Sequence, residues 1–280
     1  MSKILQYLND RADNARFWKR SVLSFVLISL LYFWYSSMML QHVFDSPFQY
    51  KGADMTYWFF DSIGLVAFLT SSKFMAFSFS CLLVLSFAVA LLWIENRWLT
   101  IIAGLLLLIY QVVFNMKIGY HTHHLFGFQF ALLPFYFSKK LFSQALGLAR
   151  ILTCLAYFFA GFFKLYQKAW LVPDSFAHVL ENQHAAYFYF NPNDLRSVVC
   201  KTIIEHPGIG YVFFVSAMLL QLSFAIGLFT NKYNRILALF ILLFHIMDWF
   251  LMNLGVFMGM TVLMWVLLYK EKSESLSIRA

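Results

Sequence analysis

Charged residues are scarce in this sequence: Asp, Glu, Lys and Arg together make up 12% of its 280 residues. A soluble domain carries about 25% charged and about 45–50% apolar residues, whereas this chain is 61% hydrophobic. One water-soluble core of this size cannot hide so much apolar surface, so lipid must solvate much of it. The scarcity of charge therefore excludes an ordinary soluble domain and indicates an integral membrane protein.

Cysteine is scarce too, with Cys81, Cys154 and Cys200 the three present. The first two lie inside apolar runs, where a thiol behaves as a small hydrophobic side chain. Cys200 has no obvious partner in the sequence. We therefore expect neither a disulfide framework nor a cysteine zinc site.

Several signatures of known chemistry are absent. The sequence has no Walker motif, dinucleotide fingerprint, nucleophile elbow or HExxH motif. It also lacks the inverted repeat and the matched pair of broken spans that are typical of transporters. The net charge of +8 does not indicate a nucleic-acid partner, because Lys and Arg lie between apolar runs and form no basic face.

What the sequence does contain is a series of long apolar runs. A spanning helix needs roughly 17–25 mostly apolar residues, and we expect eight spans, of which the fourth and eighth are short. They are Phe17–Leu40, Phe74–Ile94, Trp98–Asn115, His124–Phe137, Gly147–Tyr166, Gly208–Phe229, Arg235–Asn253 and Leu254–Tyr269. The predicted fold class is an all-α polytopic membrane helix bundle. The apolar segment Tyr57–Thr70 contains Asp61, so an interfacial or re-entrant piece is expected there.

The positions of Lys and Arg predict the orientation of the bundle. With the N-terminus inside, 14 of the 21 basic residues fall in inner segments, six fall in outer loops, and Lys164 falls in neither. This asymmetry favours cytoplasmic termini in the cell (inner) membrane. We expect a single membrane domain over residues 1–280, with an outer cap of interfacial helices and turns over residues 167–207.

Lys164 lies near the outer end of the fifth span, in the segment Tyr157-Phe-Phe-Ala-Gly-Phe-Phe-Lys164. An ionisable group in a span costs about 2.5–3.5 kcal/mol on insertion scales, so a function is the default interpretation. One alternative is snorkelling, in which the long stem carries the amine to the headgroups. The other is a buried amine whose charged form is disfavoured and which acts as a general base.

His245 and Asp248 are three residues apart in the seventh span, so they share a helix face. They belong to a functional pocket or form an interhelical hydrogen-bonded pair that only holds the bundle together. Asn253 follows on the same span.

Histidines also cluster at the outer start of the fourth span. His121, His123 and His124 lie within four residues, but adjacent helical positions point in different directions, so no metal site is predicted. The alternative is an interfacial polar cluster. Gln129, further along, is an amide that needs partners. In the outer loop, His178, Glu181 and His184 are spaced for one helix face, which favours a solvated face over a metal site.

Polar residues from several spans thus fall at one depth in the outer half of the bundle. Lys164, His245, Asp248, Asn253, Asn115 and the histidine cluster all lie there by the predicted topology. Such convergence favours a pocket over scattered structural bonds.

Three segments resemble a known family. They are His121-Thr-His-His-Leu-Phe-Gly-Phe-Gln129, Tyr157-Phe-Phe-Ala-Gly-Phe-Phe-Lys164-Leu165 followed by Trp170, and Phe244-His-Ile-Met-Asp-Trp-Phe-Leu-Met-Asn253-Leu-Gly-Val-Phe257. In this order they are similar to the membrane domain of the vitamin K-dependent γ-glutamyl carboxylases. The wider group is the horizontally transferred transmembrane domain (HTTM) family. The resemblance covers about residues 17–268.

The resemblance implies a concrete site. The family's lysine that deprotonates vitamin K hydroquinone falls on Lys164, and a histidine acting near the carbanion falls on His245. A further pocket histidine is His121, His123 or His124. The implied cofactor is a reduced quinone, vitamin K-like or menaquinol, in a dry pocket that opens to the lipid and faces the periplasm. The animal enzyme has a large lumenal domain that helps to bind its substrate, and this sequence shows no counterpart of it. The resemblance therefore does not extend to carboxylation of glutamate in a peptide.

Two hypotheses of function follow. The first is a carboxylase-like membrane enzyme that uses a quinol to modify a small exported peptide or protein, with Lys164 and His245 as catalytic residues. Its pocket would include His121, His123, His124, Gln129, Asp248 and Asn253. The second is a non-catalytic membrane partner in the maturation, export or immunity of a secreted toxin peptide.

Overall fold

The computed structural model describes residues 15–46, 55–118, 124–252 and 260–269. Over this part of the chain the secondary structure is helical throughout, with no strand. Six of these helices are long and apolar enough to cross a membrane. Their bounds are Ala15–His42, Lys73–Leu92, Arg97–Lys117, Lys139–Tyr166, Pro207–Phe229 and Asn234–Met252. The expected all-helical fold class is thereby confirmed, and six of the eight expected spans have a helix long and apolar enough to cross a membrane.

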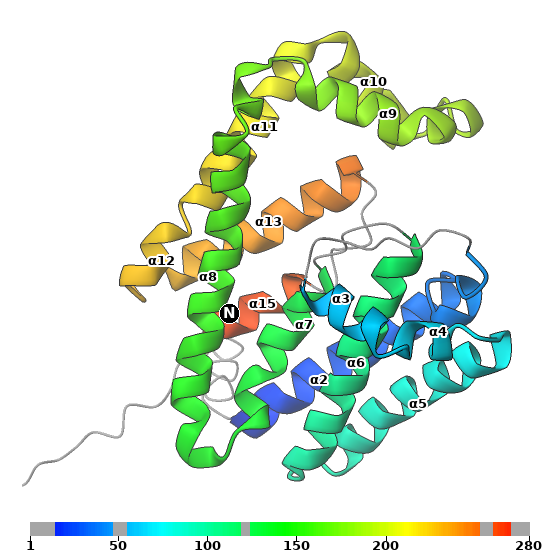
Figure 1. Cartoon of the computed structure of the whole chain (residues 1–280). Helices are drawn as coiled ribbons and strands as arrows, with labels where there is room; N and C mark the ends of the chain where they lie inside the picture. The colour runs from blue at the N-terminus through cyan, green and yellow to red at the C-terminus, as the bar shows by residue number, and fades with distance from the viewer. Residues whose placement is uncertain (1–14, 47–54, 119–123, 253–259, 270–280) are drawn as a thin grey trace, which may run out of the picture. The chain divides into compact units, whose positions relative to one another are not determined.

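The helices gather into two compact units (Figure 1). The first comprises residues 1–147 and 268–280, and the second comprises residues 148–267. The prediction of one membrane domain over residues 1–280 stays a prediction.

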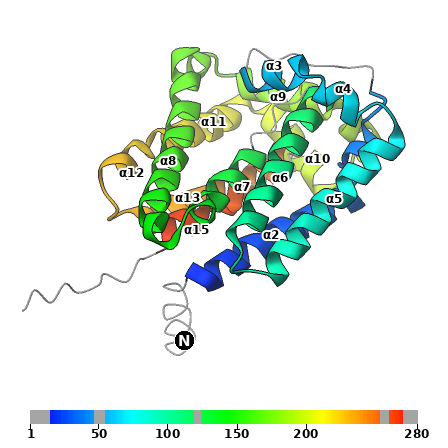
Figure 2. The same cartoon turned by 60° about the horizontal axis from the view of Figure 1, so that its bottom comes forward.

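The first unit is built on three long helices. They are α2 (Ala15–Tyr35), α5 (Lys73–Leu92) and α6 (Arg97–Ile118). Helix α5 packs against both α2 and α6 (Figure 2). Their contact faces are lined by fully buried apolar side chains such as Leu23, Leu83 and Leu107. The expected apolar piece around Asp61 is two short helices, α3 (Met55–Ser62) and α4 (Leu65–Leu69), separated at Gly64, whose φ is 71°.

Several helix ends meet around Trp18 near the start of α2. The Trp18 ring stacks on Tyr269 and meets Phe135 and Phe142 edge-on, with centroids 4.9, 5.0 and 6.0 Å away. One residue on, the amine of Lys19 donates to the carbonyl of Ile94 at 2.6 Å, just past the end of α5. The start of α2, the end of α5 and the chain near residues 135, 142 and 269 therefore lie together.

The fourth expected span is shorter than a full crossing. It consists of α7 (His124–Leu132) and the 3₁₀ turn η2 (Leu133–Tyr136). Both pack along α6, where Gln129 donates to the carbonyl of Gly104 at 2.9 Å and to Gln111 at 3.2 Å. The eighth expected span is represented by α15 (Leu263–Leu268), and residues 254–259 of it lie outside the described residues. Neither segment is among the six candidate spans.

The second unit contains the rest of α8 (Phe142–Tyr166), α11 (Pro207–Leu222), α12 (Ala225–Phe229) and α13 (Asn234–Met252). Between α8 and α11 the chain forms the turn η4 (Ala169–Leu171) and two helices, α9 (Ser175–Phe190) and α10 (Leu195–Glu205). These two helices pack on each other, and we call them the α9–α10 arm.

The turn of this arm is closed by hydrogen bonds to Asp194. Its carboxylate caps α10 by accepting from the backbone N–H of Arg196 at 3.1 Å, and it also accepts from the Tyr187 hydroxyl at 2.7 Å. The bond from Tyr187 is the main reason that the pKa of the Asp194 carboxyl lies below its usual value.

This hydrogen bond predicts an acid-sensitive arm. Because the pKa of Asp194 is lowered in the folded state, its contribution to stability is present above the unfolded pKa of about 3.9 and is lost as the pH falls through the folded pKa. The protection of the α9–α10 amides, measured as the exchange rate relative to the intrinsic rate at the same pH, should therefore fall at acid pH. In Tyr187→Phe the loss of protection should set in nearer the unfolded pKa, and an unchanged acid profile in that variant would contradict the assignment.

Candidate functional site

One face of α8 carries the polar groups of the second unit. Tyr157, Gly161 and Lys164 are spaced by four and three residues, so they lie above one another along this face. The face packs on α11 and α12, and Gly161 makes the approach close. A Cβ at Gly161 would stand 2.9 Å from the backbone nitrogen of Leu222 and 3.0 Å from the carbonyl oxygen of Met218.

Lys164 is held by α11. Its amine donates to the side-chain oxygen of Gln221 at 3.0 Å and to the carbonyl of Ala160, one turn back on its own helix, at 3.5 Å. Lys164 is only partly buried, while Gln221 is 4% exposed. The lysine therefore turns toward a buried amide of the neighbouring helix, a more specific position than simple snorkelling predicts.

Tyr157 and His245 form the second polar contact of this site. The Tyr157 hydroxyl lies 2.5 Å from Nε2 of His245 on α13, and both side chains are 3% exposed. Nδ1 of His245 lies 3.9 Å from a carboxylate oxygen of Asp248, beyond hydrogen-bond length. This buried Nδ1 has no hydrogen-bond partner among the described residues. When Nδ1 carries the ring proton, Nε2 accepts from Tyr157 and Nδ1 offers a free donor.

Aromatic rings enclose the contact between Tyr157 and His245. Phe224, in the break between α11 and α12, stacks on Tyr157 with centroids 4.5 Å apart. Phe244 lies edge-on to both Tyr157 and His245, at 6.4 and 5.0 Å. Asp248 is near enough to act electrostatically on both Tyr157 and Lys164. The site thus joins an amine, an imidazole, a phenol and a carboxylate from two helices, with Gln221 from a third.

The contact between Tyr157 and His245 predicts a structural effect of its own. Tyr157→Phe leaves Nε2 of a buried imidazole without its partner, which costs about 1–3 kcal/mol of unfolding free energy. The loss is measurable as a lower melting temperature with a thiol-reactive fluorophore, because Cys154 and Cys200 are buried and react on unfolding. The matched control is Tyr166→Phe on the same helix, where the side chain is 73% exposed. Equal melting of the two variants would argue against the hydrogen bond.

Three of the predicted site residues belong to the second unit, namely Lys164, His245 and Asp248. Gln129 and Asn115 belong to the first unit, where Asn115 is buried and Gln129 bonds to Gln111, Gly104 and Tyr136. His121, His123 and Asn253 lie outside the described residues. His124 begins α7, and its side chain is not described.

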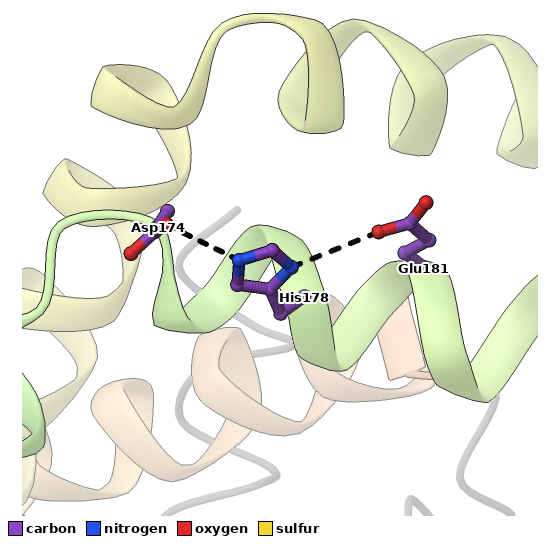
Figure 3. Close-up of polar contacts among 3 residues, drawn as sticks. All are labelled: Asp174, His178 and Glu181. Carbon is purple, nitrogen blue, oxygen red and sulfur yellow. Dashed lines mark hydrogen bonds and ion pairs between the residues drawn. The ribbon is translucent and has the colours of Figure 1, made fainter.

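The three polar residues of the outer loop separate. His178 is exposed and lies 3.1 Å from Asp174 and 3.7 Å from Glu181 (Figure 3). His184 is instead buried and lies 2.6 Å from the carbonyl of Leu251 at the end of α13. The prediction of a solvated face is therefore wrong for His184, which is buried. Within the described residues no three His, Cys, Asp or Glu side chains are placed to hold a metal ion.

Two residues of the site were missed by the sequence analysis. Tyr157 lies seven residues before Lys164, which is two turns of a helix, so its shared face was readable from the spacing. Gln221 is an amide within the apolar run of residues 207–229, and a buried amide requires a partner. Neither pattern identifies the bonding partner, which is His245 for Tyr157 and Lys164 for Gln221.

Comparison with known proteins adds no relative. No protein-family model matches the chain, and neither a curated protein nor a solved structure matches it. The resemblance to the HTTM family rests on the three sequence segments given above.

Proposed function

We propose that this chain is a membrane enzyme that resembles the vitamin K-dependent carboxylases and uses a reduced quinone to modify a small exported peptide or protein. The observation that carries the proposal is the arrangement in the second unit. A lysine amine on Gln221 lies two turns along α8 from a tyrosine–histidine pair with a free imidazole nitrogen. The residues of the site come from α8, α11 and α13, which are candidate spans, and ionisable groups in membrane helices are costly and are therefore usually retained for a function.

The residues present fit a quinol. A quinol is a flat apolar ring with hydroxyl groups at opposite ends, and the site offers aromatic faces beside a buried unpaired polar atom. When bound, a quinol would supply the electrons that reduce oxygen.

Lys164 is the proposed base. In its neutral form its amine would accept a proton from a hydroxyl of the bound quinol, and the resulting ammonium would donate hydrogen bonds to Gln221 and to the carbonyl of Ala160. The carboxylate of Asp248 balances the new positive charge. His245 is fixed by Tyr157 at Nε2, so its Nδ1–H can donate to an oxygen of the bound molecule. The rings of Phe224 and Phe244 keep water from the contact between Tyr157 and His245.

The finer topology belongs to the same proposal. We propose eight crossings with both termini in the cytoplasm, an outer cap over residues 167–207, and a site that faces the periplasm. The meeting of helix ends around Trp18 supports the number of crossings, because eight crossings put the start of the first span and the ends of the second, fourth and eighth on one side of the membrane. The excess of Lys and Arg in the inner segments supports the cytoplasm as that side. Arg16 pairs with Glu95 on that same side at 3.0 Å.

The second candidate is a non-catalytic partner in the maturation, export or immunity of a secreted peptide. The hydrogen bond between Tyr157 and His245 favours it, since such bonds also serve only to join membrane helices.

Quinone binding separates the two candidates. We expect protein purified in mild detergent to carry quinone in its extracted lipid, and reduced menaquinone to support oxygen uptake in nanodiscs. Heat-unfolded protein is the blank for spontaneous quinol oxidation. A protein with neither bound quinone nor quinol-dependent oxygen uptake would favour the non-catalytic candidate.

A further inference from the structure

The α9–α10 arm lies where three candidate spans end. Helix α8 ends at Tyr166, shortly before α9 begins at Ser175, and α10 ends at Glu205, with His206 alone between it and α11. Figure 1 shows α9 and α10 turning away from these ends of α8 and α11. A helix that crosses a membrane ends at the boundary with water. The base of the arm is therefore fixed at that boundary.

The end of α13 holds the arm at the same depth. His184 lies 2.6 Å from the carbonyl of Leu251, and Gln183 donates to the carbonyl of Met252 at 2.7 Å. The guanidinium of Arg196 lies over the rings of Tyr187 and Trp249, at 5.4 and 5.7 Å from their centroids. Three helix ends and one cation between two rings thus leave the arm little freedom to rise away from the surface.

The far end of the arm exposes large apolar side chains. Tyr189, Phe190 and Leu195 flank the turn of residues 191–194 and are 80%, 75% and 67% exposed. We call these three residues the apolar tip. Such exposure of an aromatic pair costs free energy in water. Tyrosine and other aromatic rings gather instead at the level of lipid headgroups, where one side is apolar and the other is wet.

A polar face runs along the same helix at a different angle. Asp174, His178 and Glu181 are linked along α9 and exposed (Figure 3). Val179 and Phe190 are eleven residues apart, close to three full turns, so they share another face of α9. A helix with a polar face and an apolar face at the membrane boundary lies in the plane of that boundary.

We propose that the α9–α10 arm lies in the membrane surface and that its apolar tip inserts among the lipid headgroups of the leaflet where α8, α11 and α13 end. The occupant of the tip is the lipid bilayer itself. The inference does not depend on catalysis, because it follows from the helix ends and the exposed side chains.

The experiment places an environment-sensitive fluorophore on single introduced cysteines. Phe190→Cys reports from the apolar tip, and the matched control Asn182→Cys reports from an exposed polar residue of the same helix, one turn after His178. The full-length chain is labelled with the fluorophore NBD in nanodiscs of phosphatidylcholine and phosphatidylglycerol. Wild-type protein treated in the same way gives the contribution of its three native cysteines.

We expect NBD at residue 190 to emit at shorter wavelength than NBD at residue 182. A spin-labelled lipid should quench the first label by about half and the second little, and aqueous iodide should show the reverse order. Equal quenching of both labels by iodide would place the tip in water. A label at residue 190 that neither quencher reaches would mean that protein covers the tip. Either of these two results would overturn the proposal.

Discussion

Replacing Lys164 by alanine is expected to lower quinol-dependent oxygen uptake by at least about a hundredfold, the usual loss when a general base is removed. The protein should still insert in the membrane, because the change removes a costly polar group from α8 and leaves its apolar surface intact. Gln221 loses its lysine partner, so a small change in melting temperature is expected as well. Oxygen uptake and bound quinone are measured on the same nanodisc sample.

The matched control is Lys168→Ala. Lys168 lies one turn beyond Lys164, just past the end of α8, and is exposed. A purely electrostatic contribution of lysine near the membrane surface would be lost in both variants. Full activity in Lys164→Ala, with normal folding, would sink the proposed role of this lysine. A loss of the same size in Lys168→Ala would show that general surface charge, and not a base in the site, is measured.

Gly161→Ala is expected to destabilise the second unit although it adds only a single methyl group. The added Cβ meets the backbone nitrogen of Leu222 at 2.9 Å and Cβ of Gln221 at 3.0 Å. Backbone atoms cannot rotate aside, so α8 and α11 must move apart, at a cost of about 1–3 kcal/mol of unfolding free energy. The movement also pulls Gln221 from Lys164, so activity should fall with stability.

Helix α8 contains its own control for this prediction. Gly147 has no atom within 4 Å of a built Cβ, so Gly147→Ala should raise stability by about 0.5–1 kcal/mol through the better helix propensity of alanine. Thiol-reactivity melting curves compare the two variants directly. A Gly161→Ala protein that is as stable as the Gly147→Ala protein would show that α8 and α11 are not in close contact.

The site was predictable in part because several of its residues carry a high free-energy cost in a membrane. Lys164, His245 and Asp248 stand out in apolar runs, and their cost in a membrane marks them without any knowledge of the fold. Tyr157 and Gln221 do not stand out in this way, because tyrosine and glutamine are tolerated in packed membrane helices. Which helix faces which is decided by small residues such as Gly161, and a single sequence gives no pairing between segments.

The spans were predictable to within a few residues where the apolar run is long. For Phe74–Ile94 the helix found is Lys73–Leu92, and for Arg235–Asn253 it is Asn234–Met252. The fourth expected span, which was predicted as short, is divided into α7 and a 3₁₀ turn, because Pro134 follows the end of α7 and cannot continue its hydrogen bonding. His184 was wrongly predicted to be solvated. The spacing of residues on a helix shows which residues share a face, but not whether that face meets water or protein. Here His184 contacts the carbonyl of Leu251 at the end of α13.

The stacking of Trp18 on Tyr269 has a consequence for the order of assembly. These two rings are separated by almost the whole described chain, and closing so long a loop is slow compared with local helix formation. During synthesis, the face of the Trp18 ring that stacks on Tyr269 stays uncovered by that residue until the segment around Tyr269 has left the ribosome. The contact between these two rings therefore closes late, and the interval before it closes is when chaperones and proteases can act on the first unit.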